Sequence, residues 1–112
     1  MIIFLLACAT SAPSVPPDSP VEALRSRPLK LTRHARERMA CRHISLSEIE
    51  KIQKTGTNIP KRARTDGACP SFAFEGLDDD NGPIRVVFAA CPSVTKVVTA
   101  IDLDEEFHCS DR

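Results

Sequence analysis

Trp and Tyr are absent from this chain of 112 residues, and Phe, at five positions, is its only aromatic residue. This scarcity argues against an RNA-binding platform built from several surface aromatic side chains. The apolar run at the N-terminus is too short to span a bilayer as a helix, which takes about 20 residues. The length allows for one small domain.

The chain has no net charge, but its two signs are separated along the sequence. Residues 25–64 hold 12 basic and 3 acidic side chains, whereas residues 65–112 hold 3 basic and 10 acidic ones. This separation indicates a dipolar molecule or a basic face. It bears on binding partners rather than on the fold.

The N-terminus resembles the signal of a bacterial lipoprotein. The apolar run MIIFLLA leads into LLAC at residues 5–8, and in a lipobox of this kind cleavage before the cysteine leaves a thiol that carries a lipid. The Pro- and Ser-rich stretch that follows is typical of a tether. We therefore predict a signal at residues 1–7, lipidation of Cys8, a tether over residues 8–27 and a domain over residues 28–112. This places the protein in the cell envelope; the alternative is an apolar N-terminus without such a role.

Four further cysteines remain for the domain, and an even number in a small exported domain predicts two disulfides with three connectivities. Residues that face each other in an antiparallel hairpin have a constant sum of their numbers. The pair Cys69 and Cys91 has the same sum as the pair Phe72 and Phe88, so one register aligns both pairs. We therefore predict a Cys69–Cys91 disulfide.

Cys41 and Cys109 are then paired by elimination. The alternative for a reducing compartment is a zinc site made of Cys41, His43, His108 and Cys109. Neither CxxC nor HxxxH spacing is present, which disfavours zinc.

Capping residues mark two helices. Thr32 is suited to be the N-cap of a helix over residues 33–42. Ser45 and Glu48 form a capping box that opens a second helix, which ends before Gly56.

The second helix is expected to turn Leu46, Ile49 and Ile52 inward. Strand patterns follow over residues 58–64, 71–76, 83–90 and 94–103. The order predicts an α+β domain in which two N-terminal helices pack on one face of a three- to four-stranded antiparallel sheet.

Residues 32–39, TRHARERM, followed by RHIS at residues 42–45 and by Glu48, resemble the opening of a bacterial family, domain of unknown function 4258. That opening runs Ser/Thr-x-His-Ala-x-x-Arg-Met and then Arg-Gly-Ile-Ser, so His43 stands where the family usually has Gly. Members of the family are often small bacterial proteins or C-terminal domains of toxins, and they look related to the barnase- and RelE-like ribonuclease toxins. The resemblance implies helices before an antiparallel sheet, but a fold does not by itself define an activity.

His34 and Arg38 are the candidate catalytic residues, since they lie one turn apart on the first helix. A histidine can transfer a proton near neutral pH, and an arginine can bind the phosphate that is cleaved. Thr99, on the same strand face as Val97 and Ile101, is expected to join them beneath the helices. These three residues would form a metal-independent endoribonuclease without a cofactor.

Phosphate contacts are expected from five cations in the basic half of the chain. These are Arg33, Arg42, Lys61, Arg62 and Arg64. The expected partner is then RNA, met inside a target cell after delivery.

Two alternatives remain open. In the first, His34 caps the helix or bonds the backbone of the sheet, and Arg38 pairs with Glu75, Asp102 or another acid of the C-terminal half, so that both have structural roles. In the second, the protein is a non-catalytic envelope module that binds a protein partner of the immunity or adaptor type, next to the membrane that its lipid enters.

Overall fold

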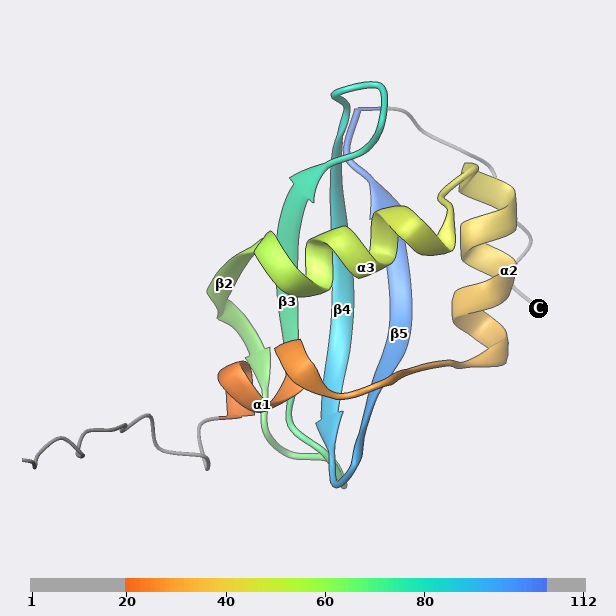
Figure 1. Cartoon of the computed structure of the whole chain (residues 1–112). Helices are drawn as coiled ribbons and strands as arrows, with labels where there is room; N and C mark the ends of the chain where they lie inside the picture. The colour runs from red at the N-terminus through yellow and green to blue at the C-terminus, as the bar shows by residue number, and fades with distance from the viewer. Residues whose placement is uncertain (1–19, 105–112) are drawn as a thin grey trace, which may run out of the picture.

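The computed structural model describes residues 20–104, which build a five-stranded sheet with helices on one face (Figure 1). The elements are α1 (Pro20–Ser26), β1 (Leu29–Leu31), α2 (Arg33–Arg42), α3 (Leu46–Thr55), β2 (Thr57–Arg64), β3 (Ser71–Leu77), β4 (Pro83–Cys91) and β5 (Val94–Asp102). The strands lie in the order β1-β5-β4-β3-β2, and only β1 pairs in parallel, with β5. The α+β class is confirmed, but the expected two helices and three to four antiparallel strands are too few.

Both missed elements lie before α2. α1 has seven residues and β1 has three, too few for an apolar periodicity to show in the sequence. Leu24 of α1 is nevertheless fully buried, and its carbonyl accepts hydrogen bonds from Gln53 Nε2 at 2.7 Å and Thr95 Oγ1 at 2.8 Å. α1, which lies within the stretch expected to be a tether, therefore packs on the core.

Arg25 ties α1 to the end of α3. Its guanidinium donates to the carbonyls of Gln53, Lys54 and Gly56 at 3.0–3.2 Å, and it lies over the Phe74 ring at 4.7 Å from the centroid. The last carbonyls of a helix have no partner within the helix, and a cation there also interacts favourably with the helix dipole. Arg25 thus supplies the partners that the end of α3 lacks.

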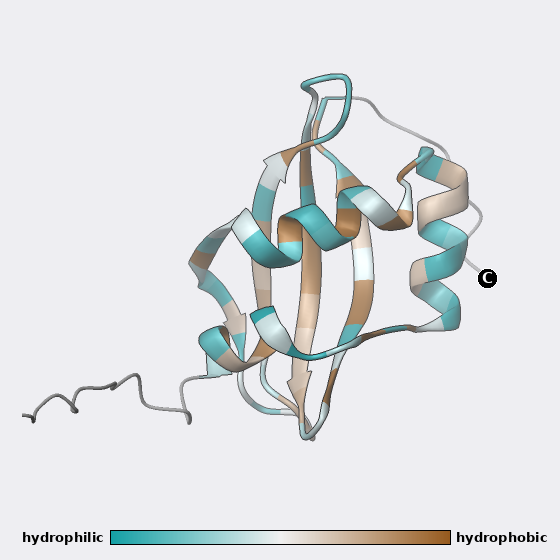
Figure 2. Cartoon of the chain, viewed as in Figure 1, coloured by the Kyte–Doolittle hydropathy of each residue, from teal (hydrophilic) through white to brown (hydrophobic). Residues whose placement is uncertain are grey.

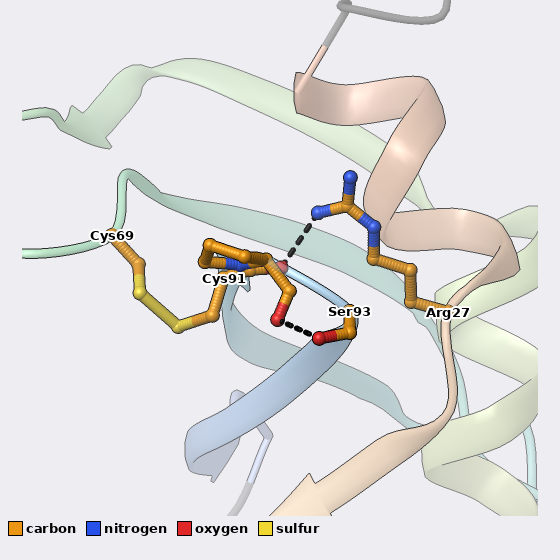
Figure 3. Close-up of a disulfide and its surroundings, with 5 residues drawn as sticks. Arg27, Cys69, Cys91 and Ser93 are labelled. Carbon is orange, nitrogen blue, oxygen red and sulfur yellow. Dashed lines mark hydrogen bonds between the residues drawn. A yellow bond between two sulfur atoms is a disulfide. The ribbon is translucent and has the colours of Figure 1, made fainter.

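The hairpin of β3 and β4 has the predicted register. Phe72 pairs with Phe88, and a disulfide joins Cys69 to Cys91 with their Cα atoms 5.0 Å apart. Figure 3 shows the Arg27 side chain donating to the carbonyl of Cys91 beside this disulfide, at 2.6 Å. A cross-link over a loop of this length stabilises a domain by about 3 kcal/mol.

The core lies between the helices and the inner face of the sheet. Figure 1 shows α1 and α3 crossing that face and α2 standing beside β5. Apolar residues run along β4 beneath α3, as the colouring of Figure 2 shows. Phe74 and Phe88 meet edge to face there, with ring centroids 5.6 Å apart. Within residues 20–104, no helix is long and apolar enough to cross a membrane.

The two ends of α2 are fixed by Thr32 and His43. Thr32 Oγ1 accepts from the Ala35 N–H at 2.9 Å, which confirms the predicted N-cap. His43 ends the helix with φ 58°, in the left-handed region. Glycine adopts that conformation without a Cβ clash, which gives a physical reason for the glycine that the family usually has here.

The capping box of α3 is confirmed, since the Ser45 side chain accepts from the Glu48 N–H and the Glu48 side chain accepts from the Ser45 N–H. Gly56 follows the helix as expected, but with φ −68° rather than a left-handed conformation. Glycine is needed there for space, because a Cβ would lie 2.6 Å from the Ile52 carbonyl oxygen.

The inner face of α3 differs from the expected one. Ile49 and Ile52 are buried, but Leu46 is 45% exposed. Gln53 is buried in its place, because its amide donates to the carbonyls of Leu24 and Arg27. Because glutamine is polar, the apolar pattern of the helix did not predict that Gln53 would be buried.

Glu48 links α3 to the turn between β3 and β4. Burial raises the pKa of its carboxyl, but hydrogen bonds from the N–H groups of Ser45 (2.7 Å) and Asp79 (2.8 Å) and from the Ser45 hydroxyl outweigh burial and lower the pKa overall. The ionised form is therefore stabilised by folding. Its contribution is present above the pKa of the unfolded chain and is lost as the pH falls through the lowered pKa of the folded state.

We expect Glu48→Gln to lower the free energy of unfolding at pH 7 by about 1.5–3 kcal/mol, because an amide cannot accept from donors on both sides. Urea unfolding at pH 7 and near pH 3 measures this, and the difference between variant and wild type should shrink at the lower pH. Glu50→Gln, at an exposed position of the same helix, is the control. Equal stability of the two variants at pH 7 would contradict this role for Glu48.

Candidate functional site

A basic cavity of about 400 Å³ lies on the face of the sheet that the helices leave open. Ala73 and Val87, which are paired across β3 and β4, lie in its wall, and they alternate along their strands with core residues such as Phe72 and Phe88. Adjacent residues of a strand point to opposite faces. The cavity is therefore on the face opposite α1 and α3, behind the sheet in the view of Figure 1.

Three predicted phosphate ligands meet at this cavity: Lys61, Arg62 and Arg64 of β2. β2 is an edge strand, and its pairing with β3 shifts between Ile59 and Arg64. Several residues of β2 therefore face a single residue of β3. Such a bulge changes the direction in which side chains point at the edge of the sheet. Pro60, which has no N–H to donate, lies inside this irregularity.

Arg85 of β4 adds a fourth cation to the cavity. Glu75 lies opposite it in the hairpin and accepts hydrogen bonds through one oxygen, Oε2, from Arg85 Nε at 2.9 Å and Nη2 at 2.8 Å. The Arg85 side chain is 18% exposed and that of Glu75 is 32% exposed. The pair fixes the plane of the guanidinium. It uses Nε and one N–H of Nη2, so the Nη1 N–H groups and the second N–H of Nη2, which form the Nη edge, do not take part in it.

The sequence did not single out Arg85, although the signal was present. The register that aligned Cys69 with Cys91 also sets Glu75 opposite Arg85, and opposite charges across a strand pair favour an ion pair. Arg85 lies in the acidic half of the chain, where the separation of charges gives no reason to expect a phosphate ligand.

His34 and Arg38 are in contact, as their spacing predicted. Arg38 Nε donates to His34 Nε2 at 3.4 Å on the exposed side of α2. Of the two nitrogens of the His34 ring, Nε2 therefore faces Arg38. Glu75, one proposed partner of Arg38, is paired with Arg85 instead. The contact places a side chain of the kind that transfers protons next to one of the kind that binds phosphates.

Thr99 does not lie beneath the helices, so this expectation was wrong. Val87 pairs with Thr99 and Phe88 with Val97, so Val98 is an extra residue in β5. The bulge reverses the side-chain alternation: Val97 and Ala100 are both fully buried, and Thr99 points to the open face with Val87. A sequence pattern of strict alternation cannot show such a reversal.

The other two predicted phosphate ligands lie elsewhere. Arg33 forms an ion pair with Glu37 at 3.3 Å along α2. Arg42 donates to the carbonyl of Ala100 and borders a different hollow, which four aspartates also line. The structure thus gathers Lys61, Arg62 and Arg64 and leaves these two apart.

Several expected sites depend on residues outside 20–104. They are the lipidation site Cys8, the Cys41–Cys109 disulfide and the zinc alternative, which needs His108 and Cys109. Within the described residues, no group of three or more His, Cys, Asp or Glu side chains is arranged to hold a metal ion.

Comparison with known protein families gives a match over most of the described residues. No curated protein and no solved structure matches the chain. The family model described as "Domain of unknown function (DUF4258)" matches residues 31–102, which run from the end of β1 to the end of β5. α1 thus lies before the matched region, although its side chains are part of the core. The chain therefore belongs to this family, DUF4258.

Proposed function

We propose that this domain binds RNA on the open face of its sheet. The observation that carries the proposal is the convergence of Lys61, Arg62, Arg64 and Arg85 around one cavity. Clustered cations on one face favour a polyanion, because each phosphate contact releases counterions from the nucleic acid. The resemblance to ribonuclease toxins favours RNA as that polyanion.

Cleavage is the second step of the proposal. His34 would act as the proton-transfer group, and the neighbouring Arg38 would stabilise charge on the phosphate. Both side chains project from α2, and their mutual contact supports a joint role. Thr99, on the open face, would contact the bound strand rather than pack under the helices.

Export and lipid anchoring at Cys8 remain part of the proposal. The Cys69–Cys91 disulfide supports export, because structural disulfides form and persist in oxidising compartments. A protein held in its own envelope meets no RNA there, so the proposal includes delivery to another cell.

A second candidate function is protein binding at a groove between α3 and β1. Leu29, Leu31 and Leu46 line this groove, which has a volume of about 780 Å³. Leu46 is 45% exposed, and exposed apolar side chains beside a groove are typical of protein-binding surfaces. The groove supports the alternative of an immunity or adaptor module.

The variant His34→Ala separates binding from cleavage. We expect it to reduce the rate of RNA cleavage by about 10²- to 10⁴-fold, the usual contribution of a general acid or base. RNA affinity and the melting temperature should hardly change, because His34 is exposed and surface substitutions usually alter stability by less than about 0.5 kcal/mol.

Cleavage rate, binding constant and melting temperature are measured on the same purified variant. Lys51→Ala, an exposed position on α3, is the control. Wild-type protein that binds RNA without cutting it, or a His34→Ala variant that cuts at the wild-type rate, would contradict the catalytic part of the proposal.

A further inference from the structure

The basic cavity is lined by apolar as well as by charged side chains. Among the residues that line it, Ala73 is 2% exposed, and Val87 and Ile101 are half-buried. The cations lie around these residues, and Ser71 adds a hydroxyl. These apolar side chains offer contact area to a part of a ligand other than its phosphate.

We propose that this cavity takes one unpaired nucleotide. The phosphate lies on the Nη edge of Arg85, and the base or ribose lies against Val87 and Ile101. The inference rests on the proposed function and adds that the RNA is bound in its unpaired form. Ligand pockets have volumes of about 300–1,000 Å³, and the cavity of about 400 Å³ is therefore suited to a single small unit of this kind.

An unpaired nucleotide fits this apolar lining better than a base pair does. In an RNA duplex the faces of the bases are stacked on one another, and a protein meets mainly phosphates and 2′-hydroxyls. A splayed base exposes its flat face, and contact of that face with apolar side chains contributes to binding affinity. Contact with Val87 and Ile101 therefore favours unpaired RNA over a duplex, and the cations contribute affinity for either form.

Glu75 is the second feature that a simple cationic patch does not explain. A carboxylate beside a phosphate site weakens anion binding by direct repulsion. Its two contacts with Arg85 hold the guanidinium in one orientation, and an oriented guanidinium can bind a phosphate through two parallel hydrogen bonds. We assign Glu75 as a positioning residue for Arg85.

The two possible roles of Glu75 predict opposite changes in RNA affinity when the residue is replaced by alanine. If Glu75 acts only through its charge, Glu75→Ala and Glu75→Gln should both bind RNA more tightly than the wild type. If Glu75 positions Arg85, Glu75→Ala should bind about five- to tenfold more weakly, because the lost orientation outweighs the lost repulsion. Glu75→Gln should recover most of this loss, since its Oε1 can still accept from Arg85.

The test measures binding of an unpaired RNA oligomer by the purified full-length protein and these two variants. Glu50→Ala, which removes an exposed carboxylate from α3, is the control for charge alone. Weaker binding by Glu75→Ala with recovery in Glu75→Gln, at unchanged melting temperatures, supports the positioning role. Tighter binding by both variants overturns it.

A second set of titrations tests the form of the ligand. The probes are the unpaired oligomer, a duplex of the same length, a nucleoside monophosphate and inorganic phosphate. We expect the wild type to favour the oligomer over the duplex by at least about fivefold, and we expect Val87→Asn to lose that preference. Competition by the monophosphate but not by inorganic phosphate would indicate that one free nucleotide fills the cavity, whereas competition by neither would assign the site to a nucleotide within a strand.

The outcomes also separate this inference from the proposed function. Equal affinity for oligomer and duplex, unchanged by Val87→Asn, overturns the nucleotide site and leaves RNA binding by the basic face intact. Failure of the wild type to bind either RNA overturns both.

Discussion

Replacement of Lys61, Arg62 and Arg64 by glutamine is expected to weaken RNA binding about 100-fold at 0.1 M salt. Each phosphate contact to a single strand contributes about 0.7 to the slope of log affinity against log salt. Three lost contacts should therefore reduce the magnitude of that slope by about 2. The three side chains are exposed on the edge strand, so their replacement should leave the melting temperature nearly unchanged. Fluorescence anisotropy over a range of salt concentrations measures both quantities.

The matched control removes three cations that do not line the cavity. Arg33, Lys51 and Lys54 are exposed on α2 and α3, and their replacement by glutamine changes the net charge by the same amount. This triple variant should bind RNA with nearly wild-type affinity and salt slope. Equal losses in the two triple variants would mean that RNA responds to total charge and not to this site.

Phe74→Ala is expected to lower the free energy of unfolding by about 3–5 kcal/mol, the usual cost of removing a large buried aromatic side chain. Phe74 is fully buried, packs edge to face on Phe88 and lies beneath the Arg25 guanidinium. In a domain of this size the melting temperature should fall by more than about 12 °C. Denaturation under non-reducing conditions keeps the Cys69–Cys91 disulfide intact during the measurement.

Leu77→Ala is the control for Phe74→Ala, because Leu77 lies at the end of the same strand but is 48% exposed. Its effect on stability should be small. A loss below about 1 kcal/mol in Phe74→Ala would contradict the position of Phe74 at the centre of the core.

Local signals predicted much of the fold. The capping box of Ser45 and Glu48 fixed the start of α3, because side chains three residues apart satisfy donors that the helix itself leaves unpaired. The Cys69–Cys91 pair fixed the hairpin, because antiparallel pairing constrains all pairs of a register at once. Family membership followed from a short motif over residues 32–39, together with residues 42–45 and Glu48.

The missed features depend on contacts between distant parts of the chain. α1 is held by Gln53 and Thr95, which bond its backbone from far along the sequence. The reversal of Thr99 comes from a bulge against β4, and no local pattern in β5 marks it.

The candidate site was predicted in part. The sequence pointed to Lys61, Arg62 and Arg64 through their charge, but the cavity forms only when the bulged β2 pairs with β3, whose other neighbour, β4, carries Arg85. Arg85 therefore needed the paired sheet to be recognised as a member of the site.

The most direct test of the account is to map where RNA binds. Backbone amide NMR shifts of the isotopically labelled protein are followed while a short unpaired RNA is added. The account predicts that the largest changes occur at the residues around the cavity, with Arg64, Ser71 and Arg85 among them. Changes confined to the groove of Leu29, Leu31 and Leu46, or to the exposed side of α2, would contradict binding on the open face of the sheet.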